Sequence, residues 1–396
     1  MENINRGFGT KLIHDGQNSI ENKRHMIPPL ILDSAMPIDD ISWGIDLLRN
    51  EKINGFFYSR YSNPTVKILE EKISSLEEAE ASITCSSGMT AVWLAILALC
   101  NTGDDILIPY NVYHEISDFL FYLKKINISV SLVDMENIES IQSAINENTK
   151  MIFIESPTNP MLRILDISVI ASICKKKSIY FVVDNTMLTP YGQQPLKMGA
   201  DLSLHSTTKF LNGHGDAIGG ILCGSEKLIS EIKKLSDFAG TIMPPFNAWL
   251  TIRGLKTLDV RMCRHCQNAM ELANYLSRHP KVLSVTYPGL ESFGQKALVD
   301  KQMNSNGGIV TFDIRGGKLA GEQFLRNIRM CRVATTFGNA ETVVYHFATF
   351  ARPSRDIEKI GEGLGSIRCS VGLENIDDII YDFQNALKET IVGEVD

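Results

Sequence analysis

Short apolar segments alternate with helical patterns through the first half of this 396-residue chain. Four of these segments are rich in β-branched residues: 104–110 (DDILIPY), 128–134 (ISVSLVD), 150–157 (KMIFIESP) and 179–185 (IYFVVDN). Helical patterns such as 167–177 (ISVIASICKKK) lie between some of them. Strands that alternate with helices predict a mostly parallel sheet wrapped by helices, an α/β fold. Ligands of such sheets bind beyond the carboxyl ends of the strands.

The rest of the chain differs from this pattern. Residues 1 to about 60 read as irregular arms and turns, and the apolar run 91–100 is too short to span a bilayer and is expected to be a buried helix. A long helical stretch from near Ile252 is expected to connect to a smaller α+β domain with strands at 307–316 and 367–374. The predicted boundaries are 1–62 for an N-terminal arm, 63–255 for the larger domain and 256–396 for the C-terminal domain.

Composition narrows the class of protein. The net charge is −7, so basic residues are not in excess and neither nucleic acid nor membrane is an expected partner. The first residues, MENINRGFGT, contain no apolar signal segment, and the eight cysteines are scattered, which together predict reduced thiols in a cytoplasmic protein. The CRHC sequence at 263–266 resembles a metal or redox motif. It lies in a helical pattern without a second ligand pair, so a structural role and no metal are expected.

The stretch SLHSTTKFLNGHGDAIGG, residues 203–220, contains one lysine, Lys209, among small and hydrogen-bonding residues. Lys209 is either part of an ordinary surface loop or an amine that a ligand must reach. A desolvated lysine near another cation loses its proton and becomes a nucleophile toward aldehydes.

Three other features fall at strand ends or helix starts. The amides of Gly88 and Met89 open a predicted helix and would seat a phosphate, although Ser-Ser-Gly is also an ordinary helix cap. Asp184 ends a buried strand, where it either caps a turn or pairs with a protonated ring nitrogen. Tyr113 offers an aromatic face. Together with Lys209, these features match the four parts of pyridoxal 5′-phosphate (PLP): phosphate, ring nitrogen, flat ring and aldehyde.

Several motifs resemble the Cys/Met-metabolism family of PLP-dependent enzymes. They are YSRYSNPT (58–65), SSGMTA (86–91), ESPTNP (155–160), VVDNT (182–186), STTKFLNGHGD (206–216), RGLKTLDVRM (253–262) and IRCSVGLE (367–374). Within that family, the GHGD and RGLKTL segments are most similar to those of methionine γ-lyases. The resemblance implies PLP fold type I, aspartate-aminotransferase-like, with a seven-stranded sheet in the large domain. It also implies a homodimer with shared active sites, within a homotetramer.

The resemblance assigns roles to matching residues. Lys209 would carry the cofactor as a Schiff base and later act as a base, Asp184 would pair with the pyridine nitrogen, and Tyr113 would stack on the ring and protonate the leaving group. The other implied cofactor contacts are Gly88, Met89, Ser206 and Thr208 at the phosphate, Glu155 and Asn159 around the ring, and Tyr58 and Arg60 reaching the phosphate of the neighbouring subunit.

A second set of residues is expected around the substrate. Arg368 would clamp the α-carboxylate of an amino acid as a bidentate fork, with Asn159 and Thr336 beside it. Glu115 stands where methionine γ-lyases have a cysteine, and Thr335 where cystathionine enzymes have a glutamate. We therefore expect a retained cofactor site and an altered substrate pocket, in which Glu115 favours a polar or cationic distal group over a methyl thioether.

The predicted activity is γ-elimination on a homocysteine- or homoserine-type L-amino acid, giving a 2-oxo acid, ammonia and the leaving group. The alternative is γ-replacement, as in cystathionine γ-synthases and O-acyl-homoserine sulfhydrylases. Elimination and replacement share their early steps, so the sequence leaves both open. A third reading, a non-catalytic binding protein of the same fold, is disfavoured by the presence of Lys209, Asp184 and Arg368.

Overall fold

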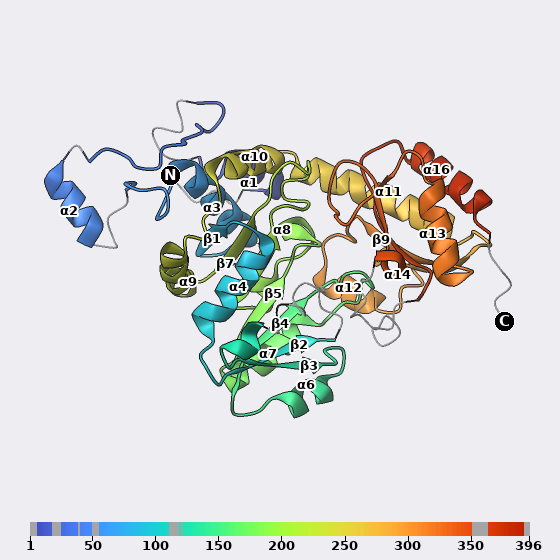
Figure 1. Cartoon of the computed structure of the whole chain (residues 1–396), viewed down its shortest axis with the longest axis horizontal. Helices are drawn as coiled ribbons and strands as arrows, with labels where there is room; N and C mark the ends of the chain where they lie inside the picture. The colour runs from blue at the N-terminus through green and yellow to red at the C-terminus, as the bar shows by residue number, and fades with distance from the viewer. Residues whose placement is uncertain are drawn as a thin grey trace.

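The computed structural model describes residues 6–17, 25–38, 40–49, 55–110, 119, 122–350 and 363–391. A seven-stranded sheet forms the centre of its larger part (Figure 1). Its strands are β1 (Ala81–Cys85), β2 (Asp105–Pro109), β3 (Ser129–Val133), β4 (Thr149–Glu155), β5 (Tyr180–Asp184), β6 (Leu202–Ser206) and β7 (Gly220–Gly224). Their order is β1-β7-β6-β5-β4-β2-β3, and only β7 runs against the other six. The expectation of a mostly parallel sheet is confirmed.

Helices cover both faces of this sheet because successive strand side chains point to opposite faces. Val182 and Leu204 pack with α4 (Gly88–Leu99) and α9 (Glu226–Ala239) on one face. Phe181 and Val183 pack with α6 (Ile138–Ala144) and α7 (Ile167–Lys177) on the other face. The helix α3 (Pro64–Glu77) shares this second face, against the odd-numbered residues of β7. The buried helix expected at 91–100 is α4.

A second sheet lies in the C-terminal part, at the opposite end of the molecule from α2 (Ile41–Arg49) (Figure 1). It contains β8 (Val282–Thr286), β9 (Ile309–Ile314), β10 (Arg332–Val333), β11 (Val343–His346) and β12 (Ser366–Ser370), in the order β10-β11-β12-β9-β8. The helices α11 (Leu258–Leu276), α13 (Gly317–Asn327) and α16 (Ile376–Glu389) pack against it around the buried rings of Phe312, Phe324 and Phe383. The α+β architecture predicted for the C-terminal part is confirmed. The remaining short helices are α8 (Thr189–Gly192), α12 (Lys296–Gln302) and α14 (Phe347–Phe350), with a 3₁₀ turn, η2, at Pro195–Met198.

The N-terminal region is less irregular than the sequence predicted. It contains α1 (Phe8–His14) as well as α2. Leu12 of α1 is fully buried, and the buried Lys72 of α3 donates to the Leu12 carbonyl at 2.9 Å. A lysine that satisfies a carbonyl near the end of a helix stabilises that end. The expectation of an irregular segment was therefore wrong for α1, which packs as part of the core.

The long helix expected from near Ile252 is two helices. The first, α10 (Pro245–Leu255), ends before Thr257, which has a non-helical φ of −112°, and α11 begins at Leu258. Arg261 donates to the Gly254 carbonyl at 2.9 Å and to the Thr257 hydroxyl at 3.1 Å. Because the Arg261 side chain provides a hydrogen-bond donor for a carbonyl at the end of α10, this helix can end without a glycine or proline after it. The apolar pattern of the sequence therefore gives no sign of the break between α10 and α11. No helix of the described residues is long and apolar enough to cross a membrane.

Candidate active site

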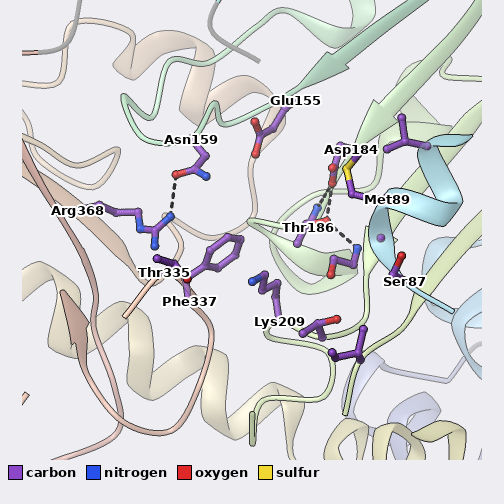
Figure 2. A pocket seen from close by; sticks show the side chains of 15 residues that line it. Ser87, Met89, Glu155, Asn159, Asp184, Thr186, Lys209, Thr335, Phe337 and Arg368 are labelled. Carbon is purple, nitrogen blue, oxygen red and sulfur yellow. Dashed lines mark hydrogen bonds between the residues drawn. The ribbon is translucent and has the colours of Figure 1, made fainter. Parts of the chain in front are cut away.

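Three adjacent parallel strands end at one pocket. Glu155, Asp184 and Ser206 are the last residues of β4, β5 and β6. The pocket has a volume of about 220 Å³ and opens at these carboxyl ends, where ligands of open α/β sheets bind (Figure 2). Its lining residues are Ser87, Gly88, Met89, Val92, Glu155, Asn159, Asp184, Thr186, Ser206, Thr208, Lys209, Ile218, Thr335, Phe337 and Arg368.

The N-terminus of α4 forms one wall. Ser87 caps this helix by accepting a hydrogen bond from the Thr90 amide at 3.1 Å. A side chain at Gly88 would begin 2.7 Å from the Cβ atom of Ser206, so glycine is needed for the helix to approach β6 this closely. The first amides of the helix thus face the pocket beside the Ser206 side chain, an arrangement that suits a phosphate group.

A second wall carries Asp184. The Thr186 amide donates to Asp184 Oδ1 at 2.9 Å, and the Thr186 hydroxyl donates to the same oxygen at 2.5 Å. Thr186 Oγ1 also accepts from the Ser206 amide at 2.8 Å, which ties the ends of β5 and β6 together. The two hydrogen bonds that described residues donate to the Asp184 carboxylate both go to Oδ1. The second carboxylate oxygen, Oδ2, can therefore accept from a donor on a ligand.

The surroundings of Asp184 act on its charge in opposite directions. Desolvation raises the pKa of the Asp184 carboxyl, while the Thr186 hydrogen bonds and the charge of His205 oppose that shift. His205 is fully buried, and its Nε2 lies 2.5 Å from Oε1 of the buried Glu77. A desolvated carboxylate gains most from a cationic partner, so Asp184 suits a protonated ring nitrogen.

Lys209 lies in the turn after β6 and points into the pocket (Figure 2). Its Nζ donates to the Thr336 hydroxyl at 3.1 Å and lies 4.9 Å from the ring centre of Phe337. Burial, followed by the charge of Arg368, lowers the pKa of the Lys209 amine to about 8. This amine therefore sheds its proton far more readily than an exposed lysine, as a nucleophile or base requires.

The C-terminal part contributes Arg368, the central residue of β12. Its Nη1 donates to Asn159 Oδ1 at 3.0 Å, and its Nη2 donates to the Thr336 carbonyl at 2.9 Å. The rings of Phe337, Tyr345 and Phe347 surround the guanidinium, with centres 5.3, 5.3 and 5.9 Å from its carbon. The cation is thereby held in place by hydrogen bonds and aromatic faces, in a site suited to a carboxylate.

Most of the predicted site residues meet in this pocket. Those that line it are Gly88, Met89, Glu155, Asn159, Asp184, Ser206, Thr208, Lys209, Thr335 and Arg368, and Thr336 contacts both Lys209 and Arg368. Thr208 Oγ1 also accepts from the Gly219 amide at 3.1 Å. Tyr113 and Glu115 lie outside the described residues.

Tyr58 and Arg60 do not line the pocket within one chain. Tyr58 forms a β-bridge with Ala35, and the Arg60 guanidinium donates to the Asp237 carbonyl at the end of α9. Arg60 also lies over the Tyr61 ring, at 4.3 Å from its centre. Their expected action on a neighbouring subunit stays a prediction.

Several lining residues were missed by the sequence reasoning: Ser87, Val92, Thr186, Ile218 and Phe337. Thr186 had a usable signal, because a threonine two residues after an aspartate often turns back to its carboxylate. Phe337 had none, because only the fold brings it between Lys209 and Arg368.

The CRHC segment lies in α11, where Cys266 Sγ contacts Ser305 Oγ at 2.9 Å. Among the described residues, no group of three or more His, Cys, Asp or Glu side chains is placed to hold a metal ion.

The residues present fit PLP part by part: amides beside Ser206 for the phosphate, Asp184 for the ring nitrogen and Lys209 for the aldehyde. Together with the sheet topology, they define a PLP-dependent enzyme of fold type I. The family model described as "Cys/Met metabolism PLP-dependent enzyme" matches residues 9–388. The chain belongs to this family.

Individual relatives cover nearly the same length. An L-methionine gamma-lyase of Pseudomonas putida is 39% identical over 390 residues, which are 96% of this chain and 97% of that protein. An O-succinylhomoserine sulfhydrylase of Pseudomonas aeruginosa is 38% identical over 340 residues, 85% of this chain and 84% of the relative. The crystal structure of metB from Corynebacterium glutamicum superposes with a TM-score of 0.90 at 33% identity and covers 97% of this chain and 98% of that one.

Proposed function

We propose that the protein is a PLP-dependent lyase that carries out γ-elimination on a homocysteine- or homoserine-type L-amino acid. The observation that carries this proposal is the meeting of Lys209, Asp184 and Arg368 in one pocket. A low-pKa amine, a carboxylate and a carboxylate-binding guanidinium are what an amino-acid substrate and this cofactor require. The methionine γ-lyase relatives support elimination as the outcome.

Each residue has a role that follows from its position. When bound, the cofactor supplies an aldehyde for amine attachment and a ring that withdraws electrons from the substrate Cα. Arg368 binds the substrate α-carboxylate, and Asp184 holds a proton on the ring nitrogen. Lys209 takes the α-proton as a neutral amine, and the Thr336 hydroxyl, 3.1 Å from its Nζ, keeps that amine in place.

The second candidate is γ-replacement, in which an external thiol displaces the leaving group. The sulfhydrylase relative supports it, since that protein is 38% identical over 340 residues. The deciding assay incubates the enzyme with each substrate, with and without a thiol acceptor, and measures 2-oxo acid. Elimination yields 2-oxo acid without the acceptor, whereas replacement yields a new thioether only with it.

We propose that Glu115 sets the preference for the group at the distal end of the substrate side chain. A carboxylate near the γ-substituent favours a cationic distal group through a charge-assisted hydrogen bond, worth roughly 1.5–3 kcal/mol, or about tenfold to hundredfold in kcat/KM. We expect wild type to prefer a distally cationic analogue such as canavanine over methionine, and Glu115→Cys to reduce that preference. The measurement is kcat/KM for methionine, cystathionine, O-acyl-homoserines and canavanine. Methionine as the best wild-type substrate, or an unchanged ranking in Glu115→Cys, contradicts this prediction.

We also propose that two subunits share each active site, within a homotetramer. The support is that the exposed Tyr58 and the half-buried Arg60 lie outside their own pocket, and that Arg60 contacts the end of α9, where Phe238 is exposed. Arg60→Ala and Lys209→Ala enzymes should each be nearly inactive. Their mixture should regain up to about a quarter of wild-type activity, because one hybrid site in two carries neither substitution and about half of random dimers are hybrids. If tagged subunits exchange and activity does not return, the shared site is wrong.

The domain boundaries 1–62, 63–255 and 256–396 and a cytoplasmic location are proposals as well. The two sheets support the division, because they lie within 81–224 and 282–370. All eight cysteines are unpaired, and six of them are buried, which is usual in a reducing compartment.

A further inference from the structure

The C-terminal end of α9 holds a cluster of charged groups next to the 58–61 turn. Lys233 Nζ donates to the Tyr61 carbonyl at 2.6 Å and to the two carboxylate oxygens of Asp237 at 2.8 and 2.9 Å. Arg60 donates to the Asp237 main-chain carbonyl and, through Nη2, to the Tyr61 hydroxyl at 3.1 Å. Lys233 and Arg60 thus both join the same turn to the same helix.

Lys233 lies on the same face of α9 as Asp237. Ser236 directly precedes Asp237 in the last turn of α9. Ser236 is only 3% exposed, and its hydroxyl lies 2.8 Å from that of Thr241, so this position faces the interior. Residues four apart share a helix face, so Lys233 lies on the Asp237 side of α9, one turn earlier.

The contacts of Lys233 differ from those of an ordinary surface ion pair. An exposed pair at this spacing contributes little to the stability of a helix and leaves the rest of the chain unaffected. Here the same ammonium also binds a carbonyl 172 residues away in sequence. Desolvation raises the pKa of the Asp237 carboxyl, and the Lys233 hydrogen bond, followed by the charges of Lys233 and Arg60, opposes that shift. Lys233 therefore favours the charged form of the Asp237 carboxyl and, together with Arg60, anchors the turn to α9.

We propose that Lys233 is a positioning residue that fixes the 58–61 turn on α9 and so orients Tyr58 and Arg60 toward the cofactor phosphate of the neighbouring subunit. This inference rests on the shared site proposed above.

The test compares Lys233→Met with Lys234→Met, and measures the affinity of the apoprotein for PLP by titration as well as kcat and KM. Lys234 is a matched control because it follows Lys233 on α9, and Glu231, at 3.5 Å, is the one described side chain that its ammonium contacts. We expect Lys233→Met to bind PLP about tenfold more weakly, as for the loss of one charge-assisted hydrogen bond. Lys234→Met should bind it like wild type, and Lys233→Arg should retain most of the affinity.

Arg60→Ala and the Arg60→Ala/Lys233→Met double variant complete the design. If Lys233 acts by holding the turn that carries Tyr58 and Arg60, the affinity lost by the double variant is smaller than the sum of the two single losses. If Arg60→Ala weakens PLP binding and Lys233→Met does not, or if the two losses add, the role of Lys233 is overturned while the shared site stands. If Arg60→Ala itself leaves PLP affinity unchanged, both the shared site and the role of Lys233 are overturned.

Discussion

Replacing Lys209 by alanine should abolish turnover, with kcat/KM falling about 10⁴-fold or more. Proton transfer by a positioned side chain contributes about 10²–10⁴-fold, and Lys209 also holds the cofactor, so the upper end of that range is expected. Borohydride reduction followed by peptide mapping should find the cofactor on Lys209 in wild type and on no residue in the variant. A label on another lysine, or substantial activity in Lys209→Ala, would contradict the assigned role.

The same residue predicts a pH dependence in the wild-type apoprotein. With a pKa of about 8, roughly a tenth of the Lys209 amine is neutral at pH 7, whereas an ordinary lysine would be neutral in only about 0.03% of molecules. The neutral amine is the form that attacks an aldehyde. The rate of PLP uptake should therefore rise with pH and level off above about 8. A profile that keeps rising toward 10 would mean that burial and Arg368 do not act on this amine as the structure indicates.

Replacing Glu77 by leucine should lower the free energy of unfolding by about 3–5 kcal/mol, because several buried polar groups would lose a shared acceptor, at about 1–3 kcal/mol for each group left without a partner. Glu77 Oε1 is fully buried and contacts His205 Nε2 at 2.5 Å, the Ser203 hydroxyl at 3.0 Å and the Asn185 amide at 3.1 Å. All three groups would be left in the interior without this acceptor. The measurement is the urea unfolding curve of the holoprotein at fixed protein and PLP concentrations, since both affect apparent stability.

Two variants sharpen this comparison. Glu77→Gln keeps an amide oxygen as acceptor and should lose less than Glu77→Leu. Glu78→Gln is the control, because Glu78 is adjacent but its side chain is 45% exposed and pairs with Lys197 at the surface. Exposed pairs of this kind contribute about 0–1 kcal/mol. If Glu77→Leu unfolds like Glu78→Gln, the buried pair is not a main support of the fold.

Much of the large domain was predictable because its central strands are buried on both faces. The segments that became β2, β4 and β5 each contain an unbroken run of three or four large apolar residues, ILI, MIFI and FVV, which is typical of strands buried on both faces. β6 and β7 were not named in advance, because LSLHS and GILCG mix small and polar residues with apolar ones. The reversed direction of β7 depends on its pairing with β1 and β6, and local sequence contains no signal for it.

The residues of the candidate site also fall into two groups, those that local sequence reveals and those that only the fold brings together. Lys209, Asp184 and the glycine at 88 could be found from local chemistry, because each is an unusual residue at a strand end or helix start. The partners that come from distant parts of the chain could not be found in this way. Phe337 and Thr336 come from a distant part of the chain, and the bond between Lys209 Nζ and Thr336 Oγ1 joins residues 127 positions apart. Arg368 was identified only through the family resemblance, since an arginine in an apolar strand has no chemical signature of its own.

The contacts of Thr336 have a consequence for which amino acids fit. Its hydroxyl holds the Lys209 amine at 3.1 Å and its carbonyl holds the Arg368 guanidinium at 2.9 Å, so one residue sets the spacing between the group that exchanges with the substrate nitrogen and the group that binds the substrate carboxylate. On the proposed function, this spacing matches a substrate in which one carbon separates the nitrogen from the carboxylate, as in an α-amino acid. A β-amino acid, with one carbon more, would place its carboxylate out of register with Arg368. The pocket would thereby select α-amino acids through the spacing of two fixed groups, whatever side chain the substrate carries.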